Sequence, residues 1–455
     1  MIFRPIKSEG LAHLSYFIGS GPEALVIDPR RDVQEYMEIA GMNCMRIVHV
    51  LETHRNEDIV TGSPELKELT GCSILHGRSL PFKYGEGVGE GDSIRLGNLR
   101  IKALETPGHT AESMTYVLYD NDNPVPLMAF TGDTIFAGST ARTDLWGTKE
   151  QASGALYDSI KNKILTLGDQ VILCPAHGAG SACGVGISDR GTSTLGYERL
   201  TNPDLQLSKE EFIAKKKGEL LETPYYFERM EAINLNGAAL KGGPACPVPM
   251  HGKDFEKVIG TGILFDTRMP ASFFAHIPGS YSIWLDGMAT FTGWIGDDEN
   301  PVYLLTERDE DVEIATKYLY RLGIDNVKGY LCGGFQAWLN GGYDTEFMGA
   351  IVPDALAGML SSNKVTLLDV RSEHEWREGR IKEAVHIYVG ELERRIGEVP
   401  RGKPIACICS TGLRASLAAS ILKRAGFGEV YNVLGGVTAW KERDYPLLYE
   451  RMLEK

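Results

Sequence analysis

The sequence has few cysteines and no long hydrophobic run. Its eight cysteines are dispersed over 455 residues without a Cys-x-x-Cys pair, so a disulfide scaffold is excluded and reduced thiols are expected. No stretch reaches the roughly 18 apolar residues that a membrane-spanning helix needs. Residues 1–10 lack the apolar core of a signal peptide and the Arg-rich, acid-free character of a transit peptide. These absences predict a cytoplasmic protein that has no membrane partner.

Positive charge is also scarce. The 47 Lys and Arg residues stand against 61 Asp and Glu residues, a formal net charge of −14. This balance argues against nucleic acid and anionic membrane surfaces as partners, but not against small anionic substrates, because a pocket can differ in charge from the whole chain. With 43% apolar and 24% charged residues, the composition is that of a globular protein. The length suggests about three domains.

Four short segments place His or Asp at the ends of predicted strands. The hydrophobic run 46–51 is typical of a buried strand, and it leads into Thr-His-Arg-Asn-Glu-Asp-Ile, with His54 at the strand's C-terminal edge. His109 follows Thr-Pro-Gly, Asp133 follows Thr-Gly and His177 follows Cys-Pro-Ala, each after a further strand-like run. Because the strands come in two batches with intervening helices, we expect an αββα sandwich of two sheets.

Two helical segments and a linker complete the first part of the chain. Helices are predicted over 57–70, where Gly71 provides the C-cap, and within the charged stretch 207–235. Residues 236–252 contain Gly-Gly-Pro and Pro-Val-Pro and are the best linker candidate. We therefore expect the first domain to span 1–250.

An internal repeat follows this linker. Asp-Thr-Arg at 266–268 precedes Thr306 by the same offset that separates Asp-Val-Arg at 369–371 from Cys409, and an Ala-Trp pair closes each unit. Each unit has short strands alternating with helices, which indicates a small α/β domain with a parallel sheet. The domain boundaries that we expect are 251–346 and 347–455.

The four His and Asp segments, in this order and at these separations, resemble the metallo-β-lactamase superfamily and in particular its persulfide dioxygenase branch. The resemblance implies that one Fe(II) per chain is held by His54, His109 and Asp133. Two imidazoles and one carboxylate are the ligands expected of a non-haem iron(II) oxygenase. Asn56 and Ile59 stand where two-metal hydrolases of the superfamily have ligands, so a binuclear site would lack part of its shell. The alternative is a decayed site whose residues serve only structure.

Several neighbouring residues have implied roles around this site. Asp58 and His177 are expected to hydrogen-bond to the ligands rather than to bind the metal. Arg142 matches an arginine that in the family faces the carboxylate end of the substrate, with a surface ion pair as the alternative. Gly-Ala-Gly at 178–180 stands where glutathione-using members have a tyrosine, so the carrier thiol stays open. Cys183 could reach the site or be an inert loop cysteine.

A second motif follows the predicted strand 404–408. Cys409 begins a loop that leads into an Ala-rich helix predicted over 415–425. Such a loop can curl its backbone N–H groups around one sulfur atom, and the helix N-terminus and Arg414 add positive potential that stabilises a persulfide anion. With its Asp-Val-Arg, Glu-Trp and Leu-Gly-Gly-Val-Thr-Ala-Trp segments, this region resembles a rhodanese, or sulfurtransferase, domain.

The rhodanese resemblance implies that Cys409 carries sulfane sulfur with the help of Arg414. The implied substrate-binding loop consists of Ser410, Thr411, Gly412, Leu413 and Arg414. In the middle repeat, Thr306 replaces the cysteine and four carboxylates within 307–311 replace the loop. Those charges would repel a persulfide or thiosulfate anion, so we expect the middle domain to be non-catalytic.

The fusion as a whole predicts a persulfide dioxygenase joined to a sulfurtransferase. A low-molecular-weight thiol persulfide would be oxidised by O2 to sulfite, and Cys409 would exchange sulfane sulfur with sulfite, thiosulfate or a thiol. Two other classes stay open: a glyoxalase II-like metallo-hydrolase with a sulfurtransferase domain, and a sulfur-relay or persulfide-sensing protein that oxidises nothing. The carrier thiol, the direction of sulfur flux and the oligomeric state, including a homo-oligomer, also stay open.

Overall fold

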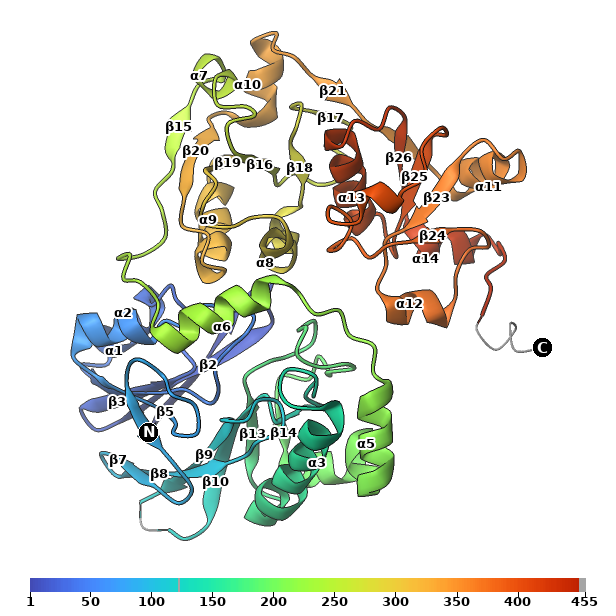
Figure 1. Ribbon diagram of the computed structural model, residues 1–455. Coiled ribbons are helices and arrows are strands. Elements are labelled where there is room, and N and C mark those ends of the chain that lie inside the picture. The colour runs from blue at the N-terminus through green and yellow to red at the C-terminus, as the bar shows by residue number, and fades with distance from the viewer. Residues whose placement is uncertain (122, 450–455) are drawn as a thin grey trace. The chain divides into compact units, whose positions relative to one another are not determined.

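The chain folds into two compact units in the computed structural model, which describes residues 1–121 and 123–449 (Figure 1). The first unit consists of Met1–Glu219 and Tyr226–Gly243, and the second of Leu220–Tyr225 and the chain from Pro244 onward. The last division falls inside the segment 236–252 that the sequence marks as a linker.

Two mixed six-stranded sheets form the first unit. One sheet has the order β1-β2-β3-β4-β5-β6 and the other β14-β13-β10-β9-β8-β7. The first contains β1 (Ile2–Ser8), β2 (His13–Ser20), β3 (Glu23–Ile27), β4 (Arg46–Leu51), β5 (Ser73–Gly77) and β6 (Glu86–Val88). The second contains β7 (Ser93–Leu96), β8 (Leu99–Glu105), β9 (Met114–Asp120), β10 (Pro126–Gly132), β13 (Ile172–Pro175) and β14 (Ser193–Thr194). A small ribbon pairs β11 (Ile135–Phe136) with β12 (Ser139–Thr140).

The sheets pack face to face and helices cover their outer faces. Ile18, Leu25, Tyr116 and Phe130 belong to the core between the sheets. The helices of this unit are α1 (Gln34–Met42), α2 (Ser63–Thr70), α3 (Lys149–Ser159), α4 (Leu195–Thr201), α5 (Lys209–Gly218) and α6 (Tyr226–Asn236). Side chains of α1 and α2 join the core on the outer face of the first sheet, and those of α3 join the core on the second. This is the αββα sandwich expected from the sequence.

Two helix predictions are wrong in their extent. The helix expected over 57–70 begins only at Ser63, because residues 57–62 form an irregular, buried segment. The helical stretch expected over 207–235 is divided between α5 and α6. The helical spacing of residues 57–70 favours a longer helix than the one that forms, so long-range contacts override the local pattern there.

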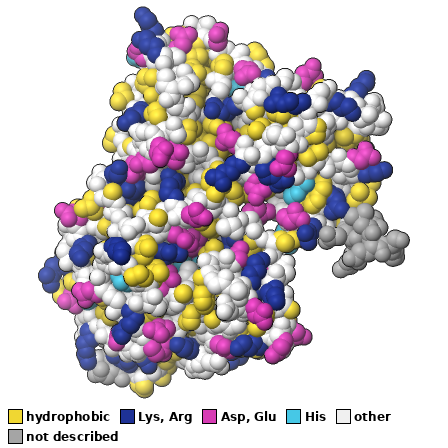
Figure 2. Space-filling model, in the orientation of Figure 1, with side chains coloured by type: hydrophobic (Ala, Val, Ile, Leu, Met, Phe, Trp, Pro, Cys, Tyr) yellow, Lys and Arg dark blue, Asp and Glu magenta, His cyan; other side chains and the backbone are white. Residues whose placement is uncertain are grey.

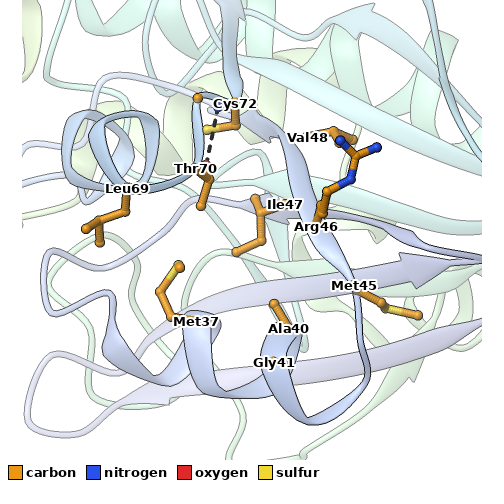
Figure 3. A pocket seen from close by; sticks show the side chains of 11 residues that line it. Met37, Ala40, Gly41, Met45, Arg46, Ile47, Val48, Leu69, Thr70 and Cys72 are labelled. Atoms are coloured by element: carbon orange, nitrogen blue, oxygen red, sulfur yellow. Dashed lines mark hydrogen bonds between the residues drawn. The ribbon is translucent and has the colours of Figure 1, made fainter.

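The first unit has an apolar hollow between α1, α2 and the strand β4 (Figure 3). Its volume is about 440 Å³, and its walls include Met37, Met45, Leu69 and Cys72. The hollow lies on the helix-covered side of the first sheet, so it is separate from the strand ends that carry the His and Asp segments.

The second unit contains two five-stranded parallel sheets of the same topology. Their orders are β15-β20-β19-β16-β18 and β22-β26-β25-β23-β24. The first sheet consists of β15 (Val248–Met250), β16 (Ile263–Asp266), β18 (Tyr281–Ser282), β19 (Val302–Leu305) and β20 (Val327–Leu331). The second consists of β22 (Gly349–Ile351), β23 (Thr366–Asp369), β24 (Val385–His386), β25 (Ile405–Ile408) and β26 (Val430–Val433). A separate ribbon pairs β17 (Ala275–His276) with β21 (Glu346–Phe347). The shared strand order agrees with the internal repeat in the sequence.

Helices surround both parallel sheets. Those of the first repeat are α7 (Gly252–Glu256), α8 (Met288–Phe291), α9 (Asp311–Arg321) and α10 (Gly334–Asn340). Those of the second are α11 (Pro353–Ser361), α12 (Glu373–Glu378), α13 (Leu413–Arg424) and α14 (Gly436–Glu442). The helix after Cys409 therefore begins two residues earlier than the sequence predicts, directly inside the Cys409 loop.

The surface carries interspersed charges of both signs on the face shown in Figure 2. Within residues 1–121 and 123–449, no helix combines the length and the apolar character needed to cross a membrane.

Candidate metal centre and sulfur-transfer site

His54 is held in one orientation by residues beneath it. It follows β4 and is buried, and its Nδ1 lies 2.9 Å from Thr53 Oγ1. The Thr53 hydroxyl donates to Asp28 Oδ2 at 2.7 Å, and the Thr53 backbone N–H donates to Asp28 Oδ1 at 2.7 Å. Because the hydroxyl hydrogen is used in this way, Oγ1 accepts from the Nδ1–H of His54. The opposite ring nitrogen, Nε2, is buried without a hydrogen-bond partner, which leaves its lone pair available to a metal.

His109 and Asp133 meet His54 from the ends of β8 and β10. The His109 Nε2 lies 3.5 Å from Asp133 Oδ2, and the His54 Nε2 lies 3.9 Å from the same oxygen. The two imidazole rings are 5.1 Å apart between centroids. His109 Nδ1–H donates to the carbonyl of Arg142 at 3.3 Å, which turns Nε2 toward the cluster. The three ligands predicted from sequence thus come together at one end of the sandwich.

Glu57 is a fourth member of the cluster that sequence reasoning missed. Its Oε1 lies 3.1 Å from His109 Nε2, and its Oε2 lies 3.9 Å from His54 Nε2. The Cys183 thiol donates to Glu57 Oε1 at 3.2 Å. One ligand atom each of Glu57, His109, Asp133 and Cys183 all lie within 4.8 Å of one another. Glu57 stands in the first signature, but the helix expected over 57–70 gave no reason to turn it toward the imidazoles.

Asp58 and His177 form a chain behind Asp133. His177 Nδ1 lies 2.7 Å from Asp133 Oδ1, and its Nε2 lies 3.0 Å from Asp58 Oδ2. The imidazole thereby orients the Asp133 carboxylate, as expected for groups that support a metal ligand. Ile59, nearby in the chain, is a buried apolar residue, so it offers no ligand for a second metal.

The residues of this cluster could hold a metal ion, and Asp58, His177 and Cys183 form a second group of possible ligands. Two imidazole nitrogens and a carboxylate oxygen suit iron or a similar metal, and the His54 Nε2 is a buried polar atom without a hydrogen-bond partner among the described protein groups. The cluster also contains a second carboxylate and a thiol. Its donors therefore allow a metal at His54, His109 and Asp133 with Glu57 and Cys183 at its side.

Opposite charges at this centre shift pKa values strongly. Burial alone would lower the pKa of His109, but the Glu57 and Asp133 carboxylates outweigh burial and raise that pKa to about 9. Burial would raise the pKa of Glu57, but the imidazoles of His109 and His54 lower it to about 2. The pKa of His54 is lowered, mainly by burial. Without metal, the centre therefore holds a protonated His109 between two carboxylates at neutral pH.

The metal-free protein is expected to lose stability as pH rises from about 6.5 to about 9. The pKa of His109 in the fold, about 9, exceeds its ordinary value of 6.5, so its proton stabilises the fold fully below pH 6.5 and ceases to do so above pH 9. Metal binding needs the neutral imidazole, so metal affinity should rise over the same range. Thermal melts of metal-free protein should show a falling melting temperature.

The His109→Gln variant is the control for this pH dependence. It lacks the titrating group, so its metal-free melting temperature should change much less between pH 6.5 and 9.5. A metal-free parent protein with a flat profile across this range would contradict the protonated His109.

Arg142 holds the loop that carries Cys183. Its guanidinium is buried and donates to both carboxylate oxygens of Asp144, at 2.7 and 2.8 Å, and to the carbonyl of Ala182 at 3.2 Å. Its backbone N–H donates to the carbonyl of Cys183 at 3.0 Å. Burial and the nearby Glu57 raise the pKa of the Cys183 thiol well above its usual value. The Arg142 guanidinium thus donates to protein groups. The Cys183 side chain lies at the centre as a protonated thiol.

Cys409 lies at the bottom of a backbone loop in the second unit. It follows β25, is buried, and its Sγ accepts the backbone N–H of Gly412 at 3.1 Å. Helix α13 begins at the next residue, so its N-terminus faces the sulfur. Gly436 lies so close that an added Cβ would meet the Cys409 carbonyl oxygen at 2.1 Å. A glycine is required there because α14 must approach the loop closely.

Arg414 is paired with Glu375 rather than being a free cation. Its Nη1 and Nη2 donate to the two Glu375 oxygens, each at 2.7 Å, and Nη2 also donates to Ser410 Oγ at 2.8 Å. Sequence reasoning expected Arg414 to add positive potential to the loop. It did not reveal this partner, which lies on α12, far away in the chain.

The first repeat shares the scaffold of this site without its sulfur. Asp266 and Arg268 form a buried ion pair at 2.6 Å, and Asp369 and Arg371 form the same pair at 2.6 Å in the second repeat. Thr306, at the end of β19, is buried and its hydroxyl has no hydrogen-bond partner. The ion pair is therefore a structural feature common to both repeats.

The comparisons with known proteins agree with this fold and site. A model of the metallo-beta-lactamase superfamily matches residues 9–177, and a model of the rhodanese-like domain matches residues 352–443. The chain thus combines a metallo-β-lactamase-fold domain with a C-terminal rhodanese-like domain, and both sequence resemblances are confirmed.

Two relatives identify the family of the first unit more specifically. The mitochondrial persulfide dioxygenase ETHE1 of Mus musculus is 34% identical over 207 residues, which cover 44% of this chain and 74% of the relative. The Homo sapiens protein of the same name is 33% identical over 220 residues, 47% of this chain and 77% of the relative. The chain therefore belongs to the ETHE1 persulfide dioxygenase family.

A solved structure extends the likeness beyond the first unit. The crystal structure of a metallo-beta-lactamase from Staphylococcus aureus subsp. aureus COL is 30% identical, with a TM-score of 0.65. The aligned residues cover 73% of this chain and 98% of the Staphylococcus aureus chain. The aligned share of this chain is larger than the share that the first unit makes up, so the similarity continues into the second unit.

Proposed function

We propose that this protein oxidises a low-molecular-weight thiol persulfide with O2 to sulfite at one Fe(II), and that it transfers sulfane sulfur through Cys409. The observation that carries the proposal is the cluster of His54, His109 and Asp133 at one end of the sandwich, with the buried His54 Nε2 unpartnered. The 33% and 34% identities to persulfide dioxygenases support it.

The chain's own residues would prepare the metal site in three ways. Thr53 and Asp28 fix the His54 tautomer, the Arg142 carbonyl fixes that of His109, and His177 orients Asp133. Fe(II) bound there would supply open coordination positions for a persulfide sulfur and dioxygen. The overall reaction balances as R–S–SH + O2 + H2O giving R–SH, sulfite and two protons.

Sulfur transfer would take place in the Cys409 loop. The thiolate attacks the outer sulfur of the donor, the donor's S–S bond breaks, and Cys409 becomes a persulfide. The Gly412 N–H and the N-terminus of α13 then stabilise the anionic sulfur. Transfer to sulfite would give thiosulfate, and the reverse direction would give persulfide.

The division of labour forms part of the same proposal. We assign oxidation to residues 1–250 and transfer to residues 347–455. A supporting, non-catalytic role falls to residues 251–346, because Thr306 lies where a sulfur carrier would be needed. A cytoplasmic location rests on the composition of the sequence alone.

The experiment that tests this function is metal analysis combined with oxygen uptake. Protein loaded with Fe(II) under nitrogen is expected to hold one iron per chain and to consume O2 only when a thiol persulfide is added. A panel of persulfides would identify the carrier thiol. Hydrolysis of a glutathione thioester without oxygen uptake would instead indicate a metallo-hydrolase, and iron-loaded protein with neither activity would indicate a sulfur-relay or sensing protein.

A further inference from the structure

The mouth of the Cys409 loop holds a charge pair instead of a free cation. Arg414 and Glu375 interact through two hydrogen bonds of 2.7 Å, and their side chains are 19% and 29% exposed. Glu375 also accepts the Ser410 hydroxyl and the backbone N–H of Ser372. The carboxylate is therefore fixed between α12 and the loop, and it cannot turn away from Arg414 without breaking several hydrogen bonds.

Glu375 and Arg414 both stay charged, and their opposite charges compensate each other. Burial would raise the pKa of Glu375, but Arg414 and the Ser410 hydroxyl outweigh burial and lower it to about 2. Tyr388, a further group close to Arg414, has a pKa raised mainly by burial and stays neutral. The Arg414 charge is therefore compensated by Glu375, and the hydrogen bond to the sulfur itself comes from the Gly412 N–H.

Thiosulfate and thiol persulfides differ in the negative charge that they bring to the Cys409 loop. Thiosulfate is a dianion whose sulfonate must come close to the loop, so it gains from an uncompensated cation. A thiol persulfide brings less charge, because its sulfur carries at most one negative charge and its R group can be uncharged. In the first case Cys–S⁻ and S–SO3²⁻ give Cys–S–S⁻ and SO3²⁻. In the second case Cys–S⁻ and R–S–SH give Cys–S–SH and R–S⁻.

We propose that Glu375 is a positioning residue that acts through Arg414: by neutralising the guanidinium, it makes the Cys409 loop favour thiol persulfides over thiosulfate as sulfur donors. This inference rests on the proposed sulfur-transfer function of Cys409. Sulfur would then reach Cys409 mainly from thiol persulfides, the same substrate class that the metal centre is proposed to oxidise.

The test compares donor selectivity in the full-length protein and its Glu375→Gln variant. Cys409 persulfidation is followed by mass spectrometry under nitrogen, so that no donor is lost to oxidation. The donors are thiosulfate and a persulfide whose thiol part is uncharged. Glutamine keeps the size and part of the hydrogen bonding of Glu375 but frees the Arg414 charge. The thiosulfate rate constant should rise about 5-fold, while the persulfide rate constant should change less than about 2-fold.

The Glu373→Gln variant is the matched control. Glu373 lies on the same helix, and its carboxylate lies 2.7 Å from Arg377 Nε and 3.4 Å from His386 Nδ1, so the net charge changes equally without freeing Arg414. Its donor ratio should equal that of the parent. The gain of Glu375→Gln should also shrink at high salt, because freed charge at a partly exposed site is screened.

Several outcomes would overturn the inference. Equal changes for both donors, or the same shift in Glu373→Gln, would show that Glu375 does not set selectivity. If Glu375→Gln unfolds, salt dependence in the parent decides: a steep fall of the thiosulfate rate with salt would mean that Arg414 already acts as a free cation. Failure of both donors to load Cys409 in the parent would instead contradict the sulfur-transfer function itself.

Discussion

Replacing His109 with alanine is expected to lower iron affinity more than about 100-fold and to abolish persulfide-dependent oxygen uptake. The side chain supplies one of three proposed ligands, and the two remaining ones cannot complete a stable site. Iron per chain after gel filtration and an oxygen electrode measure the two effects. His49→Ala, which removes an imidazole from β4 outside the centre, should retain both iron and activity.

The same substitution should affect the metal-free fold more than His54→Ala does. His109 lies 3.1 Å from Glu57 and 3.5 Å from Asp133, so its loss leaves the buried Glu57 carboxylate without its nearest cation and removes one cation from beside Asp133. His54 Nε2 has no hydrogen-bond partner to lose. Both variants should lose iron, but His109→Ala should melt at the lower temperature. Retained iron and oxygen uptake in either variant would remove that residue from the ligand set.

Replacing Cys409 with serine is expected to lower sulfur transfer more than about 1,000-fold while leaving oxygen uptake unchanged. A serine hydroxyl cannot form a persulfide, so the carrier step has no substitute. Transfer is measured from a sulfur donor to cyanide or dithiothreitol, and oxidation is measured on the same preparation. The Cys407→Ala variant, altered in the preceding strand, should keep both activities if its core still folds.

This second prediction separates the two proposed activities. If oxygen uptake disappeared together with transfer in Cys409→Ser, the two sites would not act independently and the division of labour would be wrong. If transfer persisted, another thiol would be the carrier.

The sequence predicted the parts of the metal centre that lie directly after strands. His54, His109 and Asp133 follow hydrophobic runs whose C-terminal ends gather at one side of the sandwich, so their convergence could be expected. Glu57 could not be placed, because local spacing favoured a helix there while the fold keeps residues 57–62 irregular. Tertiary contacts with the two imidazoles, not helix propensity, set its direction.

The partners of the two arginines could not be read from the sequence. Arg142 pairs with Asp144 two residues away but also holds the carbonyl of Ala182 in a distant loop. Arg414 pairs with Glu375 across the fold. A sequence motif shows that an arginine is present, but not whether its guanidinium is already paired with a carboxylate of the protein. Both residues drew expectations of substrate binding, and the structure surrounds both with protein acceptors.

The stoichiometry of the reaction tests most directly whether the first unit is an iron-dependent persulfide dioxygenase. Cys409→Ser protein loaded with one Fe(II) per chain should consume one O2 for each sulfite formed from a thiol persulfide, and should not hydrolyse a glutathione thioester. Thioester hydrolysis, or sulfite formation without oxygen uptake, would contradict the account.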